Sequence, residues 1–245
     1  MAYLPILTYH RILRHPGDRI VDPHRIAVSR EQFDRHCAWF RRIGLRTIPL
    51  AEYVSILRSG RPLPPRRLAI TFDDGYEDVG TYGMPILAKY GFTATLFAVP
   101  GDLGGTNQWD DSSAPLMNAD QLRAWQRAGH EIGAHSMHHA HLTRLSGEQA
   151  FNEMSDSKKA LEDALGKPVP LLAYPYGETN NMVGRLAQEA GFEAAFATDH
   201  APRDHAANPY WLRRAVVFPR NSIWEMFCKT RRWYPRYQDW KRRHR

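Results

Sequence analysis

Two adjacent carboxylates are the clearest candidates for chemistry in this 245-residue chain. Asp73 and Asp74 follow a short apolar run and precede Gly75. Adjacent residues at the end of a strand point in different directions, so one carboxylate can bind a cation while the other stays free as a base. Asp and Gly also favour solvated turns. The pair alone therefore leaves a catalytic site and a plain turn equally open.

His135 and His139 have the spacing of a shared metal site. On a helical turn, residues four apart lie on one face with their Cβ atoms about 6 Å apart, and we expect these two side chains to bind one ion in that way. A histidine-rich loop without a role is the alternative, because His138 and His141 stand beside them. Two histidines and Asp74 would leave positions open for water and substrate, as a catalytic zinc site requires.

Short apolar runs recur along the chain and predict the strands that position these residues. The runs are Leu4–Tyr9, Leu68–Phe72, Ala94–Val99, Glu131–Ala134, Leu171–Tyr174, Ala194–Thr198 and Ala215–Phe218. Helical stretches lie between most of them, so the order predicts βα units on a parallel sheet. About seven strands favour a barrel, or a nearly closed one, over a short open sheet.

The expected helices have recognisable ends. N-cap residues followed three positions later by Gln are Ser29 with Gln32, Asn118 with Gln121, and Ser146 with Gln149. Glycines that favour the left-handed conformation at helix ends are Gly44, Gly91, Gly129, Gly166 and Gly191.

Polar side chains follow the predicted strands. They are Tyr9-His10, Asp73-Asp74, His135, Tyr176 and Asp199-His200. The carboxyl ends of parallel strands meet at one face of such a fold, where active sites lie. We therefore expect these scattered residues to converge on one site.

Three segments resemble the successive motifs of the polysaccharide deacetylase family, also known as the NodB-homology domain. They are Thr71–Gly75, His135-Ser-x-x-His139 and Tyr174–Gly177, in family order. The resemblance covers about residues 4–220 and implies a distorted (β/α) barrel, commonly of seven strands. Family members remove acetyl groups from chitin-like, peptidoglycan or xylan substrates.

The resemblance also implies roles for individual residues. Asp74, His135 and His139 match the metal ligands, with Zn²⁺ as the expected ion and Co²⁺, Ni²⁺ or Mn²⁺ as alternatives. Asp73 matches the general base. The backbone amide of Tyr176 matches the donor that stabilises the oxyanion.

Two departures from the family pattern lead to two further expectations. Ala173 stands where many members have an arginine that orients the catalytic Asp, and no late Leu-x-His motif follows. The opening Leu7-Thr-Tyr-His10 resembles the branch of poly-β-1,6-N-acetylglucosamine deacetylases, in which a histidine on the first strand takes the place of the acid. We expect His10 to be the general acid, against a histidine that only bonds a loop. Arg214 is expected to replace the missing arginine beside Asp73, although a surface role fits it equally.

The charge of the chain is concentrated at one end. The chain has 33 Lys and Arg and 26 Asp and Glu, a net charge of +7, and residues 229–245 alone contain eight basic residues and one acidic one. The rest is balanced, so no nucleic-acid partner is expected. We expect a barrel domain over residues 1–228 and a basic, aromatic tail over 229–245. A membrane surface, an anionic glycan or disorder would each fit the tail, and disorder is the expectation.

The sequence is less informative about compartment and substrate. The first residues contain neither a signal peptide nor a membrane span, so a cytoplasmic and a trimmed exported protein both stay open. The substrate expected is an acetylated glycan, and Trp109, in a long polar loop, is placed to stack on a sugar. Trp125, Tyr210 and Trp211 could also stack on sugars, but core packing is the expectation for them. A deacylase of small non-sugar amides and a carbohydrate-binding pseudoenzyme are the alternatives.

Overall fold

The computed structural model describes residues 3–15, 22–198 and 208–244. Asp199 and His200, expected near the site, lie outside the described residues.

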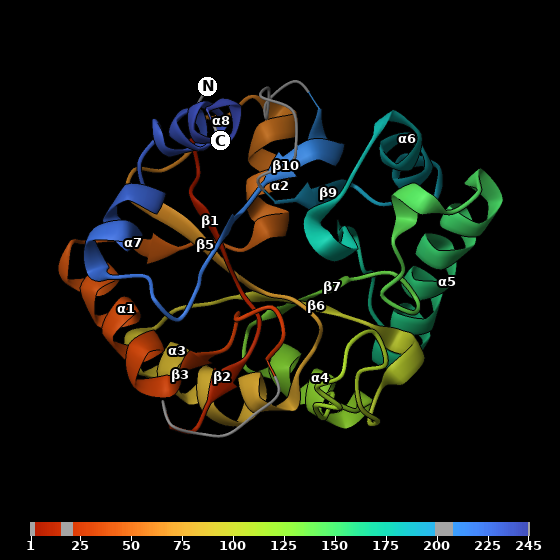
Figure 1. Cartoon of the computed structure of the whole chain (residues 1–245), viewed down its shortest axis with the longest axis horizontal. Helices are drawn as coiled ribbons and strands as arrows, with labels where there is room; N and C mark the ends of the chain where they lie inside the picture. The colour runs from red at the N-terminus through yellow and green to blue at the C-terminus, as the bar shows by residue number, and fades with distance from the viewer. Residues whose placement is uncertain (1–2, 16–21, 199–207, 245) are drawn as a thin grey trace.

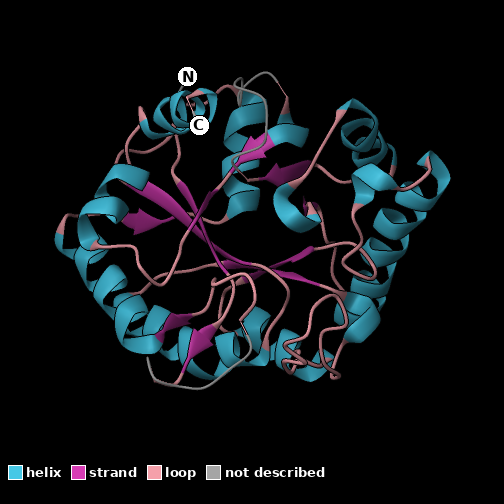
Figure 2. Cartoon of the chain, viewed as in Figure 1, coloured by secondary structure: helices cyan, strands magenta, loops and turns pink. Residues whose placement is uncertain are grey.

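Eight parallel strands form a nearly closed barrel with helices around it (Figures 1 and 2). Their order in the sheet is β10-β9-β8-β7-β6-β5-β1-β11. The strands are β1 Ile6–Tyr9, β5 Arg67–Phe72, β6 Thr95–Ala98, β7 Glu131–Ala134, β8 Leu171–Ala173, β9 Ala194–Ala197, β10 Leu212–Arg213 and β11 Ala215–Val216. β4 (Arg46–Thr47) pairs with β5, and β2 (Ile12–Leu13) pairs with β3 (Val28–Ser29) in a separate sheet. The (β/α) barrel expected from the sequence is confirmed.

The barrel is closed by one short segment of chain. β10 pairs with β9 and β11 pairs with β1, and only Arg214 stands between β10 and β11. The amide of Arg214 donates to the carbonyl of Ala197, and the amide of Val217 donates to that of Thr8. Residues 212–216 therefore act as one strand that joins both edges of the sheet. Counted in this way, the barrel has the seven strands that the sequence predicted.

The helices begin and end largely where the sequence indicated. They are α1 Arg30–Arg42, α2 Leu50–Ser59, α3 Met84–Tyr90, α4 Ala119–Arg127, α5 Gly147–Leu165, α6 Asn181–Glu189, α7 Ile223–Lys229 and α8 Tyr234–Arg243; shorter helical turns are Val79–Gly83, Pro100–Asp102, Leu142–Arg144, Pro175–Gly177 and Pro209–Trp211. Ser29 caps α1 through the amide of Gln32, and full capping boxes begin α4 at Asn118 and α5 at Ser146. The five glycines expected at helix ends all have positive φ.

Strand alternation separates two apolar layers. In β5, Leu68, Ile70 and Phe72 belong to the large core, whereas Ala69 belongs to a second cluster with side chains from β6, β8 and β9. Because successive side chains on a strand point to opposite faces, the second cluster fills the inside of the barrel. Apolar side chains of α2 also belong to this cluster. The backbone amides of Leu50 and Ala51, at the start of α2, donate to the carboxylate of Glu131 at the start of β7. α2 thus covers the amino-terminal end of the barrel.

The expectation of a disordered tail is wrong. Residues 234–243 form α8, and Asp239 on this helix accepts a hydrogen bond from Arg213 on β10 at 2.8 Å. Lys229, at the end of α7, donates to the carbonyl of Val216 at 2.8 Å. Both helices are therefore fastened to the strand that closes the barrel. Within the described part of the chain, no helix combines the length and the apolar character that crossing a membrane requires.

His36 gives the stability of this fold a predictable pH dependence. Its ring is buried on α1, its Nδ1 lies 3.0 Å from the hydroxyl of Tyr9, and burial lowers its pKa to about 4. In the unfolded chain the same group titrates near pH 6.5. The neutral ring therefore contributes stability that is complete above pH 6.5 and is lost as the pH falls towards 4.

We expect the free energy of unfolding, measured by urea titration, to fall by up to about 1.4 kcal/mol per pH unit in this range because of His36. His36→Gln keeps an acceptor for Tyr9 but does not titrate, so its pH profile should be flatter there. An equal slope in both proteins would contradict this account.

Candidate active site

The predicted site residues meet at the carboxyl end of the barrel, around a cavity of about 270 Å³. His10 follows β1, Asp73 and Asp74 follow β5, and His135 follows β7. Their direction follows from strand alternation: Asp73 continues the inward-facing series of Ala69 and Thr71. The cavity is lined by His10, Asp73, Asp74, His135, His139 and Tyr176 together with His24, Ile26, Trp109, Asp110, Gly177, Thr198, Val216 and Phe218.

Asp74, His135 and His139 form a compact, buried cluster. Oδ1 of Asp74 lies 3.3 Å from Nε2 of each histidine, and the three possible ligand atoms lie within 4.8 Å of one another. The helical turn expected for the two histidines is wrong, because residues 135–139 form a loop. Ser136 and His139 have φ values of 60° and 55°. Two left-handed residues thus bring together side chains that a helix was expected to align.

Hydrogen bonding around the cluster fits a bound cation. Nδ1 of His135 lies 2.8 Å from the carbonyl oxygen of Ala173, so Nδ1 carries the proton and the lone pair of Nε2 faces Asp74. Within the described part of the chain, Oδ1 of Asp74 has no hydrogen-bond donor although it is buried. Three converging acceptors of this kind match the ligand set of a catalytic zinc ion.

Arg214 and Asp73 form a buried two-pronged ion pair. Nη1 and Nη2 of Arg214 donate to the two carboxylate oxygens of Asp73 at 2.6 and 2.8 Å, and the residues are 1% and 3% exposed. Burial alone would raise the pKa of Asp73, but Arg214 and His135 lower it below the ordinary value. Arg214 also donates to Thr71 at 3.2 Å. The expected position of Arg214 beside Asp73 is therefore what the structure shows.

His10 lines the same cavity. Its side chain is half-buried, and the buried Nδ1 atom has no hydrogen-bond partner among the residues that the structure describes. Burial lowers the pKa of His10, while the carboxylates of Asp74 and Asp73 oppose that shift. The alternative was a histidine that only bonds a loop. Nδ1 of His10 makes no such hydrogen bond to any residue that the structure describes.

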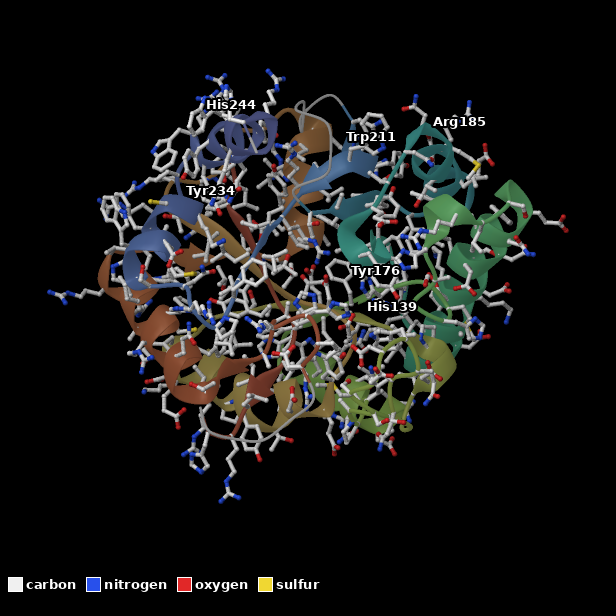
Figure 3. The ribbon with its side chains drawn as sticks, in the orientation of Figure 1. His139, Tyr176, Arg185, Trp211, Tyr234 and His244 are labelled. Atoms are coloured by element: carbon white, nitrogen blue, oxygen red, sulfur yellow. The ribbon has the colours of Figure 1, made fainter. Side chains whose placement is uncertain are left out.

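The turn after β8 lines the cavity with Tyr176 and Gly177. Tyr176 has a φ of 59° and Gly177 a φ of 66°. A Cβ atom on Gly177 would lie 1.9 Å from Oγ1 of Thr198, so only glycine fits this close approach. Tyr176 and His139 are neighbours at the centre of the molecule (Figure 3), with their rings edge-on and the centroids 4.6 Å apart. On its other side the Tyr176 ring stacks on His141 at 3.6 Å. The turn is therefore held against the loop that carries His135 and His139.

The aromatic residues divide between the site and the rest of the fold. Trp109 stacks on His139 at 4.4 Å and lines the cavity, as expected. Trp125 is buried in the core, and Tyr210 and Trp211 line a different cavity beside α6.

Sequence reasoning missed His24 at the mouth of the cavity, where its Nε2 lies 3.9 Å from Oδ2 of Asp110. No local pattern marks His24, because its position depends on the packing of the loop before β3.

Known proteins with similar sequences are polysaccharide deacetylases. A family model described as polysaccharide deacetylase matches residues 60–195. YxkH of Bacillus subtilis, whose own assignment as a polysaccharide deacetylase is provisional, is 27% identical over 221 residues, covering 90% of this chain and 74% of that protein. The poly-beta-1,6-N-acetyl-D-glucosamine N-deacetylase of Staphylococcus aureus is 25% identical over 200 residues, which cover 78% of this chain and 68% of the relative.

A solved structure supports the fold independently. The Streptococcus pyogenes deacetylase PplD, in complex with acetate, superimposes with a TM-score of 0.78 at 23% identity, over 93% of this chain and 98% of that chain. The resemblance seen in the motifs is thus confirmed by the family match over more than half of the sequence. The chain belongs to the polysaccharide deacetylase family, which consists of hydrolases that remove acetyl groups from carbohydrates.

Proposed function

We propose that this protein removes acetyl groups from a glycan that contains N-acetylhexosamine, with a divalent metal ion, Asp73 as base and His10 as acid. The observation that carries the proposal is the meeting of a buried Asp-His-His cluster with a second carboxylate in one cavity. The name of the Staphylococcus aureus relative supports an N-acetylglucosamine polymer as the substrate class.

The cluster of Asp74, His135 and His139 would hold the ion. A bound Zn²⁺ ion lowers the pKa of water from about 15.7 towards about 7 and polarises a carbonyl group. Asp73 would accept the proton of the attacking water, since its pKa is low enough to keep it ionised. Arg214 would fix the direction of that carboxylate through two parallel bonds, which a single-point contact could not do.

The remaining steps need a proton donor for the leaving amine and a hydrogen-bond donor for the developing oxyanion. His10 would supply the proton to the amine nitrogen, since it lines the same cavity as Asp73 and the cluster. The backbone amide of Tyr176 would donate to the oxyanion, a role favoured by the tight left-handed turn against His139. Trp109, stacked beside His139, offers an aromatic surface for a sugar ring.

The proposed reaction predicts acetate release that depends on Asp73. Purified protein with added Zn²⁺ should release acetate from β-1,6-linked N-acetylglucosamine oligomers, and Asp73→Asn should lower the rate about 10²–10⁴-fold. That variant leaves Arg214 buried without its partner, which can destabilise a fold by about 3–5 kcal/mol. The double variant Asp73→Asn/Arg214→Met removes both charges and should be folded yet inactive. Glycan binding without acetate release would favour a pseudoenzyme, and release from small non-sugar amides alone would favour a deacylase.

The metal site predicts a matched set of binding results. Asp74→Ala and His135→Ala should lose the zinc that the parent retains after dialysis, because each removes one of three ligands. The metal content is measured by elemental analysis of the purified proteins. His138→Ala is the control, since His138 lies in the same loop but bonds to Glu153 at 2.7 Å. Full zinc retention in both ligand variants would rule out the site.

The acid role of His10 predicts a dependence on the leaving group. His10→Ala should lose about 10²–10⁴-fold in kcat on N-acetyl substrates, because an amine cannot leave without a proton. Activated acetyl esters, whose leaving group needs none, should be largely spared. His24→Ala, at the mouth of the same cavity, should show no such difference between substrates. Equal losses on both substrates in His10→Ala would mean that His10 positions the substrate, and no loss on either would place the acid elsewhere, with His200 as the next residue to test.

A further inference from the structure

The outward face of α8 is aromatic and basic. Trp233, Tyr237 and Trp240 are 48%, 44% and 57% exposed, and Arg236 and Arg243 are exposed beside them. Residues spaced three and four apart share one face of a helix. A surface helix normally presents polar residues to water, so an outward strip of large rings requires a partner or a special environment.

The inner face of α8 fixes this orientation. Tyr234 and Asp239 are buried, and Asp239 accepts a hydrogen bond from the buried guanidinium of Arg213. The hydroxyl of Tyr234 lies 3.0 Å from Nζ of Lys229, which is also buried. Turning the aromatic rings inward would bury them at the expense of these polar contacts. Figure 1 shows α8 at the outer rim of the molecule.

The rings form one continuous strip along the helix. Trp233 and Tyr237 have centroids 6.1 Å apart, Tyr237 and Trp240 are 6.2 Å apart, and Trp240 stacks on His244 at 4.9 Å. A ten-residue helix is about 15 Å long. The strip therefore suits a flat surface along the helix better than a pocket for a single ring.

Charge identifies the partner. Residues 229–245 hold eight basic residues and one acidic one, while the other 228 residues have equal numbers of both signs. The product of the proposed reaction would bear cationic amines and would be repelled by this face. Trp and Tyr prefer the interface of a bilayer, and Arg and Lys are attracted to anionic lipid headgroups.

We propose that the outward face of α8 binds the surface of an anionic membrane, with the helix lying flat and its rings at the level of the headgroups. This binding does not require the chain to cross the bilayer. The exclusion of the glycan product rests on the proposed function, but the test measures no catalysis, so the two proposals can fail separately.

The test is co-sedimentation of the full chain with vesicles of phosphatidylcholine alone or mixed with phosphatidylglycerol. The parent should bind the mixed vesicles, with a shift of tryptophan fluorescence to shorter wavelength, and salt should weaken the binding. Trp233→Ser/Trp240→Ser and Arg236→Gln/Arg243→Gln should each lower the partition coefficient about tenfold or more. Arg127→Gln/Lys167→Gln removes two exposed charges, one on α4 and one just after α5, and should bind like the parent because these helices lie away from α8 (Figure 1).

Three results would overturn the proposal. The first is equal binding to both kinds of vesicle. The second is unchanged binding in the two α8 variants. The third is a parent protein that does not bind vesicles but binds a soluble anionic polysaccharide, or self-associates in light scattering. In that case the α8 variants would lose the polysaccharide binding or the self-association.

Discussion

The ion pair between Arg214 and Asp73 connects the closure of the barrel with the geometry of the site. Asp73 follows β5 and Arg214 belongs to the closing segment, with β1 between them in the sheet. Breaking a buried pair by removing one partner is strongly unfavourable, because the other charge stays buried. The fold therefore reaches its full stability only when the last strand is in register, and that register is the one that orients Asp73.

A polar layer beneath the pair extends this constraint into the barrel. Oγ1 of Thr71 lies 3.1 Å from Oγ1 of Thr8, donates to the carbonyl of Leu7 and accepts from Arg214. Below this layer the interior is apolar, with Phe97 under the guanidinium at 5.1 Å. Few waters can reach such an interior, so the charges above it interact more strongly than they would in solvent. The outer side of the closing strand is held in turn by α7 and α8.

Sequence reasoning found most of this arrangement wherever the signal was local. Alternating apolar runs, N-caps and helix-end glycines each depend on neighbouring residues. Together they were sufficient to predict the strands and helices of the barrel. The chemical types of Asp73, Asp74, His135 and His139 were sufficient to group them.

The errors arose where distant residues decide the conformation. The loop at His135 depends on left-handed backbone at Ser136 and His139, which neither residue type favours strongly. The tail was expected to be disordered because of its basic composition. Its helix is held by Arg213, which lies 26 residues before Asp239 and is therefore not part of any local pattern. Arg214 and Val216 are two residues apart and share the inward face of the closing segment, whereas Arg213 points outward. Strand alternation would therefore have shown which of the two arginines points towards Asp73.

The closing segment has a consequence for the evolution of the chain. Since β1 and β11 are neighbours in space, the barrel is a ring of strands that the chain could enter at any point. Moving the break between the termini to another loop would change the order of the motifs in the sequence but not their order around the ring. His10, which follows the first strand, and Arg214, in the closing segment, therefore reach one site although they lie far apart in the sequence. Descent by circular permutation would preserve such a site while concealing it from any comparison that reads motifs in linear order.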